Sequence, residues 1–175
     1  MIAARHAGLG LIEVTVALLL VSIAVLGITR ARLVALETGF SARQREQAAD
    51  LADSLLELSR GDPGALPGFR LAPGGTPDAP LQDCRSAACD SGPWGQWNLW
   101  LWLQQLQGRA VTDAGGQPLG GLSLPLACVE VSEPWITVRL NWQWRPGGAG
   151  LPGDCPVTAL ASRDGLMLRS RVGAG

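Results

Sequence analysis

An uncharged apolar run near the N-terminus constrains this chain more than any other feature. No charged residue occurs from Val14 to Ile28, and the 21 residues from Leu9 to Thr29 contain a single charge, Glu13. As an α-helix these residues would span about 32 Å, close to the thickness of the hydrocarbon core of a bilayer. A carboxylate within such a helix costs about 2.5 kcal/mol or more in lipid. Glu13 therefore requires a physical reason.

Three interpretations of this run compete. A secretory signal peptide would combine Arg5 with the apolar stretch and with a cleavage site near Ala24 or Gly27. The run is long for a signal peptide, and a signal peptide does not account for Glu13. A plain membrane anchor fits the length of the run but also leaves Glu13 unexplained.

The third interpretation rests on the stretch Gly8–Glu13, which resembles the leader signature of type IV pilins, Gly-Phe-Thr-Leu-Ile-Glu. The positions that agree with the signature are Gly8, Leu11, Ile12 and Glu13. Leu9 replaces the usual Phe, and Gly10 replaces the usual Thr. The resemblance implies that a prepilin peptidase cleaves after Gly8 and methylates the new amine of Leu9. It also implies that Glu13 pairs with the N-terminal amine of a neighbouring subunit and sets the axial register. Such an ammonium partner would offset the desolvation of the carboxylate.

The composition argues against an enzyme and against nucleic acid as a partner. The 14 basic residues, all Arg, are balanced by 15 acidic ones, so no basic surface excess is expected. The only histidine, His6, lies in the expected leader, and no P-loop or serine elbow occurs. Asp78, Asp83 and Asp90 lack the spacing of a calcium loop. We therefore predict no catalytic residue, no cofactor and no metal site.

Four cysteines follow the apolar run, namely Cys84, Cys89, Cys128 and Cys155. An even number of cysteines in an exported chain indicates two disulfides. Zinc is the alternative, but the spacing forms no paired Cys-x-x-Cys motifs and no histidine is near. Three pairings are possible. We favour Cys84–Cys89 with Cys128–Cys155, because the second pair brackets an expected hairpin.

The sequence predicts that the first helix continues well beyond the apolar run. Residues 30–60 are rich in Ala, Leu, Glu, Gln and Arg, and no proline occurs before Pro63. Their apolar residues recur every three or four positions, as in an amphipathic helix. One helix of about 50 residues is therefore expected from Leu9 to near Arg60.

A loop and a short helix are expected next. Residues 61–83 contain five prolines and five glycines, which predicts a loop. Gln96–Gln107 is predicted to be a helix, and the side chains expected on or beside its apolar face are Leu99, Leu103, Leu106 and Trp100. The tryptophans of this region are expected to fill a core or an interface rather than to stack on sugars.

The rest of the chain predicts an antiparallel sheet of about four strands. The expected strands are Leu122–Val131, Trp135–Arg145, Val157–Ala161 and Leu166–Val172. Apolar and polar residues alternate along the second of these, and Asp-Gly within Ser162–Gly165 predicts a hairpin turn. The expected fold class is α+β and type IV pilin-like, with the long helix packed against the sheet.

Two further features resemble the PilV-type minor pilins. They are the Cys84-x4-Cys89 loop followed by a helix with a Leu-Trp pair, and the stretch Gln47–Leu58. The resemblance implies a subunit that joins other minor pilins and the major pilin, primes pilus assembly and sits at the tip, with a role in twitching motility. It also implies inner-membrane anchoring with the head in the periplasm, and later display on the pilus.

A minor pseudopilin of a type II secretion system and a tip adhesin or receptor are the alternatives. The expected segments are a leader 1–8, a transmembrane and polymerisation segment 9–29, an amphipathic segment 30–60, and a head 61–175.

Overall fold

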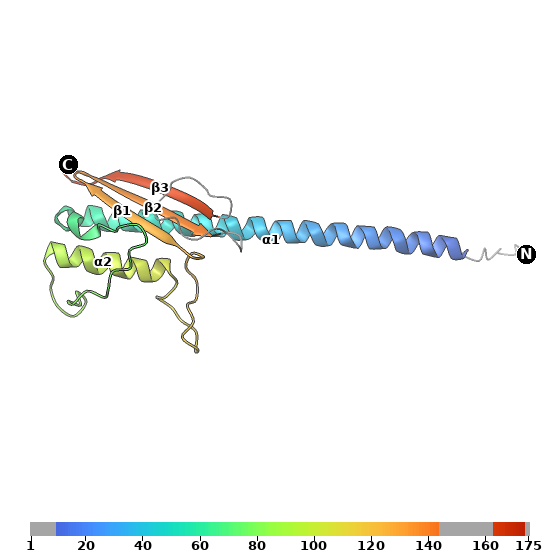
Figure 1. Ribbon diagram of the computed structural model, residues 1–175, viewed down its shortest axis with the longest axis horizontal. Helices are drawn as coiled ribbons and strands as arrows, with labels where there is room; N and C mark the ends of the chain where they lie inside the picture. Colours follow the sequence, from blue (N-terminus) through green and yellow to red (C-terminus); the bar gives the residue numbers. More distant parts are fainter. Residues whose placement is uncertain (1–9, 144–162, 174–175) are drawn as a thin grey trace, which may run out of the picture. The chain divides into compact units, whose positions relative to one another are not determined.

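The computed structural model describes residues 10–143 and 163–173 (Figure 1). The chain divides into two units, Met1–Ser41 and Ala42–Gly175, which are described separately. The first contains only helix within its described residues, and the second contains helix and an antiparallel sheet. The fold is therefore α+β, with a long N-terminal helix and a small antiparallel sheet, as predicted.

The long helix α1 runs over Leu11–Gly61, close to the predicted bounds. The predicted first residue, Leu9, lies outside the described residues. The helix ends just before Pro63, where a short 3-10 helix begins. Asp62 caps this second helix, because its carboxylate accepts a hydrogen bond from the backbone N–H of Gly64 at 3.0 Å.

The prediction that residues 61–83 are all loop was wrong. Pro63–Phe69 forms the 3-10 helix η1, and Leu71 then bridges Val129 in the sheet. Proline fixes a φ suited to a first helical turn, and η1 buries its own apolar side chains in the core. Gly68 lies against α2 so closely that an added Cβ would be 2.7 Å from the carbonyl oxygen of Gly92.

The helix α2 spans Ser91–Leu106 and starts five residues before the predicted Gln96. Pro93 lies in its first turn, where a backbone N–H has no intrahelical partner, so proline does not prevent helix there. The predicted apolar face of Leu99, Leu103 and Leu106 is buried, and Trp102, which the prediction did not place there, is buried as well. Trp100 was expected beside that face. It is half-buried and packs on Trp97, with ring centroids 5.3 Å apart.

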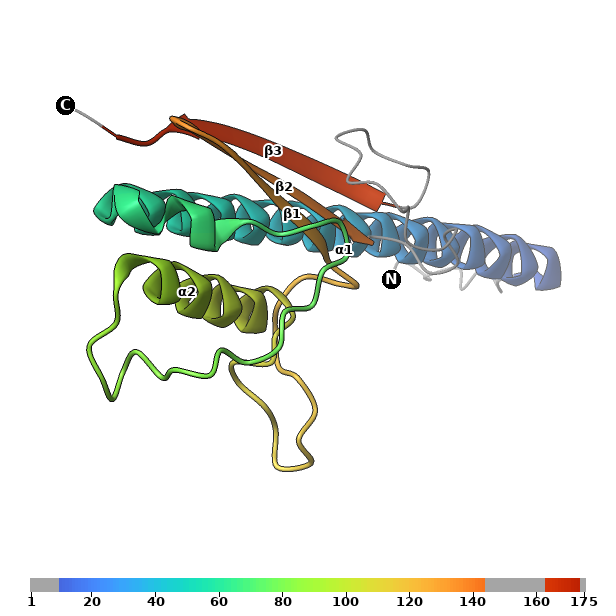
Figure 2. The same ribbon diagram turned by 60° about the vertical axis from the view of Figure 1, so that its left-hand side comes forward.

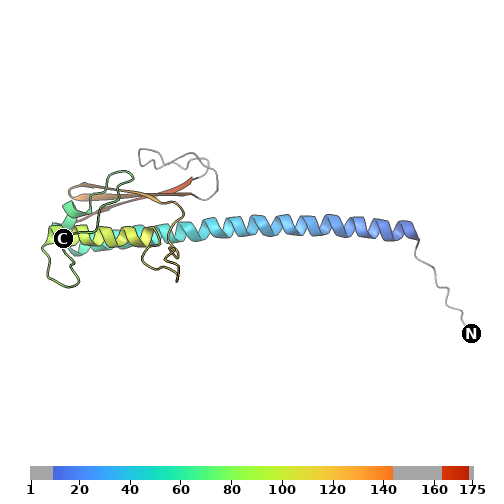
Figure 3. The ribbon, with the colours of Figure 1, turned by 60° about the horizontal axis from the view of Figure 1, so that its bottom comes forward.

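Three antiparallel strands form the sheet in the described part of the chain, in the order β1-β2-β3. They are β1 (Leu126–Ser132), β2 (Trp135–Gln143) and β3 (Arg163–Arg171). Within Ala42–Gly175 the strands form one layer, and α2 and the C-terminal part of α1 form the other (Figures 2 and 3). The core between the layers includes Leu55, Phe69, Trp102, Val138 and Trp142.

The predicted turn at Ser162–Gly165 was wrong. Asp164 and Gly165 belong to β3 and pair with Trp142 and Asn141 of β2. The local preference of Asp-Gly for a turn gives way here because the β2–β3 ladder continues through both residues and Arg45 binds the Asp164 carboxylate. The expected strand Val157–Ala161 lies outside the described residues.

Candidate functional site

The described part of Met1–Ser41 belongs to the helix α1, and its side chains from Val14 to Ile28 are uncharged and exposed. Among the described residues, α1 is the one helix that is long and apolar enough to cross a membrane. None of the most apolar part of α1 is buried within the protein. The segment is therefore compatible with a single-pass membrane anchor.

The hydroxyl groups of this apolar segment are hydrogen-bonded within the helix. Thr15 Oγ1 donates to the carbonyl oxygen of Ile12, Ser22 Oγ to Leu18 and Thr29 Oγ1 to Val25, at 2.7–2.8 Å. A hydroxyl that bonds to its own backbone leaves no donor to be satisfied by water or lipid. These three hydroxyl groups thus do not oppose membrane insertion.

Glu13 lies in the first turn of α1, with its side chain exposed. Its backbone N–H donates to the carbonyl oxygen of Gly10 at 2.9 Å. No ion pair joins its carboxylate to any residue in 10–143 or 163–173. A carboxylate is favoured at a helix N-terminus by the helix dipole, but that effect is much smaller than the cost of burial in lipid. Gly8 and Leu9, the predicted cleavage and methylation positions, lie outside the described residues.

In the unit Ala42–Gly175, the predicted disulfide Cys84–Cys89 is present, with the two Cα atoms 5.5 Å apart. Cys128 is also disulfide-bonded and is buried. Its predicted partner, Cys155, lies outside the described residues.

The disulfide loop is tied to α2 through Arg85. The Arg85 guanidinium lies 5.2 Å from the centroid of the Trp97 ring, within the range of a cation–π contact. Arg85 also donates hydrogen bonds to Asp83 from its side chain and its backbone N–H, which lowers the pKa of Asp83. One arginine therefore connects the loop to the tryptophan-rich helix.

Within Ala42–Gly175, two arginines of α1 hold β3. Arg45 donates from Nε and Nη2 to the two carboxylate oxygens of Asp164, at 3.1 and 2.9 Å. Arg60 donates from Nη2 to Ser170 Oγ at 2.8 Å. These contacts could not be predicted from the sequence, because the residues of each pair are more than 100 positions apart. No local pattern marks such a pair.

Trp102 joins α2 to the C-terminal part of α1. Its indole Nε1–H donates to the carbonyl oxygen of Leu51 at 2.7 Å, and the side chain is almost fully buried. Trp97 is buried as well. The tryptophans of α2 thus contribute to packing, and the described residues contain no cluster of three or more His, Cys, Asp or Glu side chains that could hold a metal ion.

Comparison with protein-family models, curated proteins and solved structures found no match to this chain.

Proposed function

We propose that the chain is a minor pilin of a type IV pilus, most similar to the PilV kind, whose helix is released from the inner membrane into a filament. One observation carries the proposal. Glu13 is the only charge between Gly10 and Thr29, and it lies in the first turn of an unburied apolar helix, five residues after Gly8.

The chemistry of the leader supplies a partner for this carboxylate. Cleavage after Gly8 would create a new amine on Leu9, and that ammonium group in a neighbouring subunit would offset the desolvation of Glu13. A signal peptide or a plain anchor offers no comparable partner. The cost of Glu13 in an apolar environment therefore supports a helix that assembles with other such helices.

The second unit supports the minor-pilin assignment. A disulfide loop, Cys84–Cys89, precedes the tryptophan-rich helix α2, and both belong to a unit with a small antiparallel sheet. In this proposal the head faces the periplasm before assembly and the cell surface afterwards. Its partners are prepilin peptidase, other minor pilins and the major pilin.

The experiment that tests the proposal is the intact mass and N-terminal sequence of the full chain isolated from membranes. A mature protein that starts at an N-methylated Leu9, and an uncleaved chain in a host without prepilin peptidase, would support it. A start near Ala24 or Gly27 would refute it.

Two variants sharpen this test. Gly8→Leu should abolish cleavage, because the resemblance assigns Gly8 to the cleaved bond. Gly10→Ala is the matched control and should be processed normally, since a Cβ there would have only an ordinary contact, 3.9 Å from Ile12 Cγ2. The leader alone also fits a minor pseudopilin of a type II secretion system. Deleting the gene would distinguish the two functions, because loss of twitching indicates a pilus subunit and loss of protein secretion indicates a pseudopilin.

A further inference from the structure

We infer that the outer edge of β3 binds an extended acidic strand of another protein, which would add a fourth strand to the described sheet. The inference depends on the register and side chains of the described sheet alone. It would stand whether or not the chain is a pilin.

Within residues 10–143 and 163–173, the hydrogen-bond register leaves one edge of β3 without a backbone partner. Just beyond the strand, the N–H of Val172 donates to the carbonyl oxygen of Pro134 at 2.7 Å. Hydrogen-bonded and non-hydrogen-bonded pairs alternate in an antiparallel ladder. Even-numbered residues of β3 therefore bond to β2, and odd-numbered residues direct their N–H and C=O groups away from it. Within the described residues, no hydrogen bond reaches these groups of Gly165, Met167 or Arg169.

The opposite edge of the sheet is already covered. Leu71 exchanges two backbone hydrogen bonds with Val129 of β1, each 3.0 Å long. Edge strands are usually covered, charged or very short, since open edges pair with other chains. β3 has nine residues, and no described segment covers it. Its exposed charges, Arg169 and Arg171, disfavour pairing with a neutral or basic strand but not with an acidic one.

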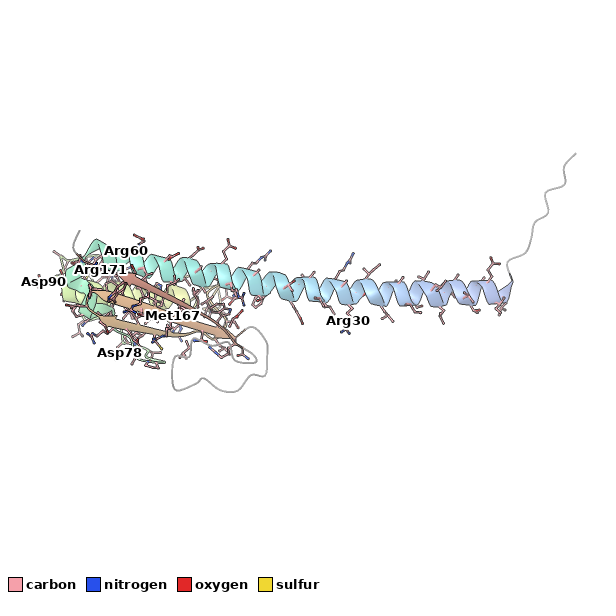
Figure 4. The ribbon with its side chains drawn as sticks, turned by 90° about the horizontal axis from the view of Figure 1, so that it is seen from above. Arg30, Arg60, Asp78, Asp90, Met167 and Arg171 are labelled. Carbon is pink, nitrogen blue, oxygen red and sulfur yellow. A yellow bond between two sulfur atoms is a disulfide. The ribbon has the colours of Figure 1, made fainter. Side chains whose placement is uncertain are left out.

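The side chains along β3 indicate what kind of strand fits. Met167, Arg169 and Arg171 are exposed on the face turned away from the helices, and Arg169 lies 4.5 Å from the centroid of the Trp135 ring. Leu166 and Leu168 are half-buried on the face that packs against the core. Met167 and Arg171 lie along β3, with Arg60 of α1 near the Arg171 end (Figure 4). A complementary strand would place carboxylates beside the arginines and apolar side chains beside the leucines.

The charges of β3 disfavour a second copy of this chain as the partner. Antiparallel pairing of β3 with itself would bring arginines of the two copies close together, and like charges across strands are destabilising. The other described strands offer no row of carboxylates either, because β1 contains only Glu130 and β2 contains none. The partner is therefore a different protein with alternating acidic and apolar residues.

The test uses the full chain in detergent micelles with two synthetic probe peptides. One peptide alternates Val and Glu, and the other alternates Val and Lys. With the acidic peptide, NMR should show slower amide exchange at Gly165, Met167 and Arg169, while Leu166 and Leu168, already bonded to β2, change little. We expect the acidic peptide to bind at least about tenfold more tightly than the basic one, from two cross-strand charge pairs.

Two sets of variants decide the origin of any binding. Met167→Pro removes an outward N–H without removing a bond to β2, and proline is tolerated at such edge positions. It should abolish binding of the acidic peptide, whereas the control Met167→Val should retain it. The double variant Arg169→Glu with Arg171→Glu should bind the basic peptide more tightly than the acidic one. If Met167→Pro does not fold, this reversal of peptide preference tests whether the peptide binds along β3.

Three outcomes would overturn the inference. They are unchanged exchange with both peptides, equal affinity for the two peptides, and protection of the same amides without peptide as protein concentration rises. The last result would show pairing between copies of this chain.

Discussion

Arg45 and Asp164 form a two-hydrogen-bond ion pair between α1 and β3, within the unit Ala42–Gly175, although 119 positions separate them in the sequence. The Asp164 side chain is 10% exposed and the Arg45 side chain 66% exposed, so water screens the pair from one side. The hydrogen bonds and charge of Asp164 raise the pKa of Arg45 above its ordinary value. The pair fixes the start of β3 on the long helix.

A double-mutant cycle with Arg45→Gln and Asp164→Asn should give a coupling free energy of about 1 kcal/mol, measured by urea unfolding. A group with a raised pKa contributes its full stability below its unfolded pKa and loses it only as the pH rises through the folded pKa. The coupling should therefore stay constant from about pH 7 to about pH 10. Arg43→Gln, two positions before Arg45 in α1 and exposed, is the control and should show no coupling to Asp164.

Gly95→Ala should destabilise the protein by about 1–3 kcal/mol. A Cβ at Gly95 would lie 2.5 Å from the carbonyl oxygen of Ala65, so η1 and α2 would have to separate. Gly92→Ala in the same helix is the matched control, because a Cβ there meets nothing within 4 Å. That control should be neutral or stabilising by up to about 1 kcal/mol. Urea unfolding of both variants measures the difference, and similar losses for both would contradict the close η1–α2 contact.

The pKa of Asp83 should lie below its ordinary value, because Arg85 donates hydrogen bonds to its carboxylate. Arg85→Gln should raise this pKa toward the ordinary value, as followed by the side-chain carbonyl carbon in an NMR titration. A lowered pKa stabilises the folded state above the unfolded value and loses that effect as the pH falls through the folded value. The Asp83–Arg85 contact should therefore open in acid. Arg109→Gln is the control variant and should leave the pKa of Asp83 unchanged.

Glu13→Gln should leave membrane insertion intact but reduce incorporation into pili by more than about tenfold. The reason is that, in the filament that we propose, the variant would leave a buried ammonium without its carboxylate, a loss that typically amounts to several kcal/mol. The amount of the protein in sheared pili, relative to that in membranes, measures the effect. Thr15→Val changes a neighbouring polar residue whose hydroxyl is already bonded to Ile12, so it should assemble normally. Equal incorporation of both variants would remove the proposed role of Glu13.

The features that the sequence predicted correctly depend on local chemistry. An unbroken helix from Leu11 to Gly61 follows from helix-forming residues without proline. The disulfide Cys84–Cys89 confirms the favoured one of three possible pairings as far as that bond. The start of η1 at Pro63 was missed, because a stretch rich in proline and glycine is typical of a loop. What makes it regular is the close approach of Gly68 to α2, which no local pattern reveals.

The candidate site likewise has one feature that the sequence reveals and others that it does not. Glu13 stands out in the sequence because it is one charge in an apolar run. The Arg45–Asp164 pair could not be predicted, and neither could the edge of β3 that has no partner among the described residues, since both depend on which residues of β2 and β3 pair. The Asp-Gly dipeptide gave the wrong prediction there. Its local preference for a turn is outweighed by the hydrogen bonds of the β2–β3 ladder, which continues to Gln143 and Arg163.

The internal hydrogen bonds of Thr15, Ser22 and Thr29 make the helix surface from Gly10 to Thr29 chemically almost uniform. Uniform surfaces can slide and rotate against one another at little cost, so packing alone would leave many orientations of nearly equal energy. Glu13 is the one group in this segment that breaks that degeneracy. In the pilin that we propose, such a helix would move freely within the bilayer and would take a single orientation once Glu13 pairs with a cationic group of a neighbouring subunit.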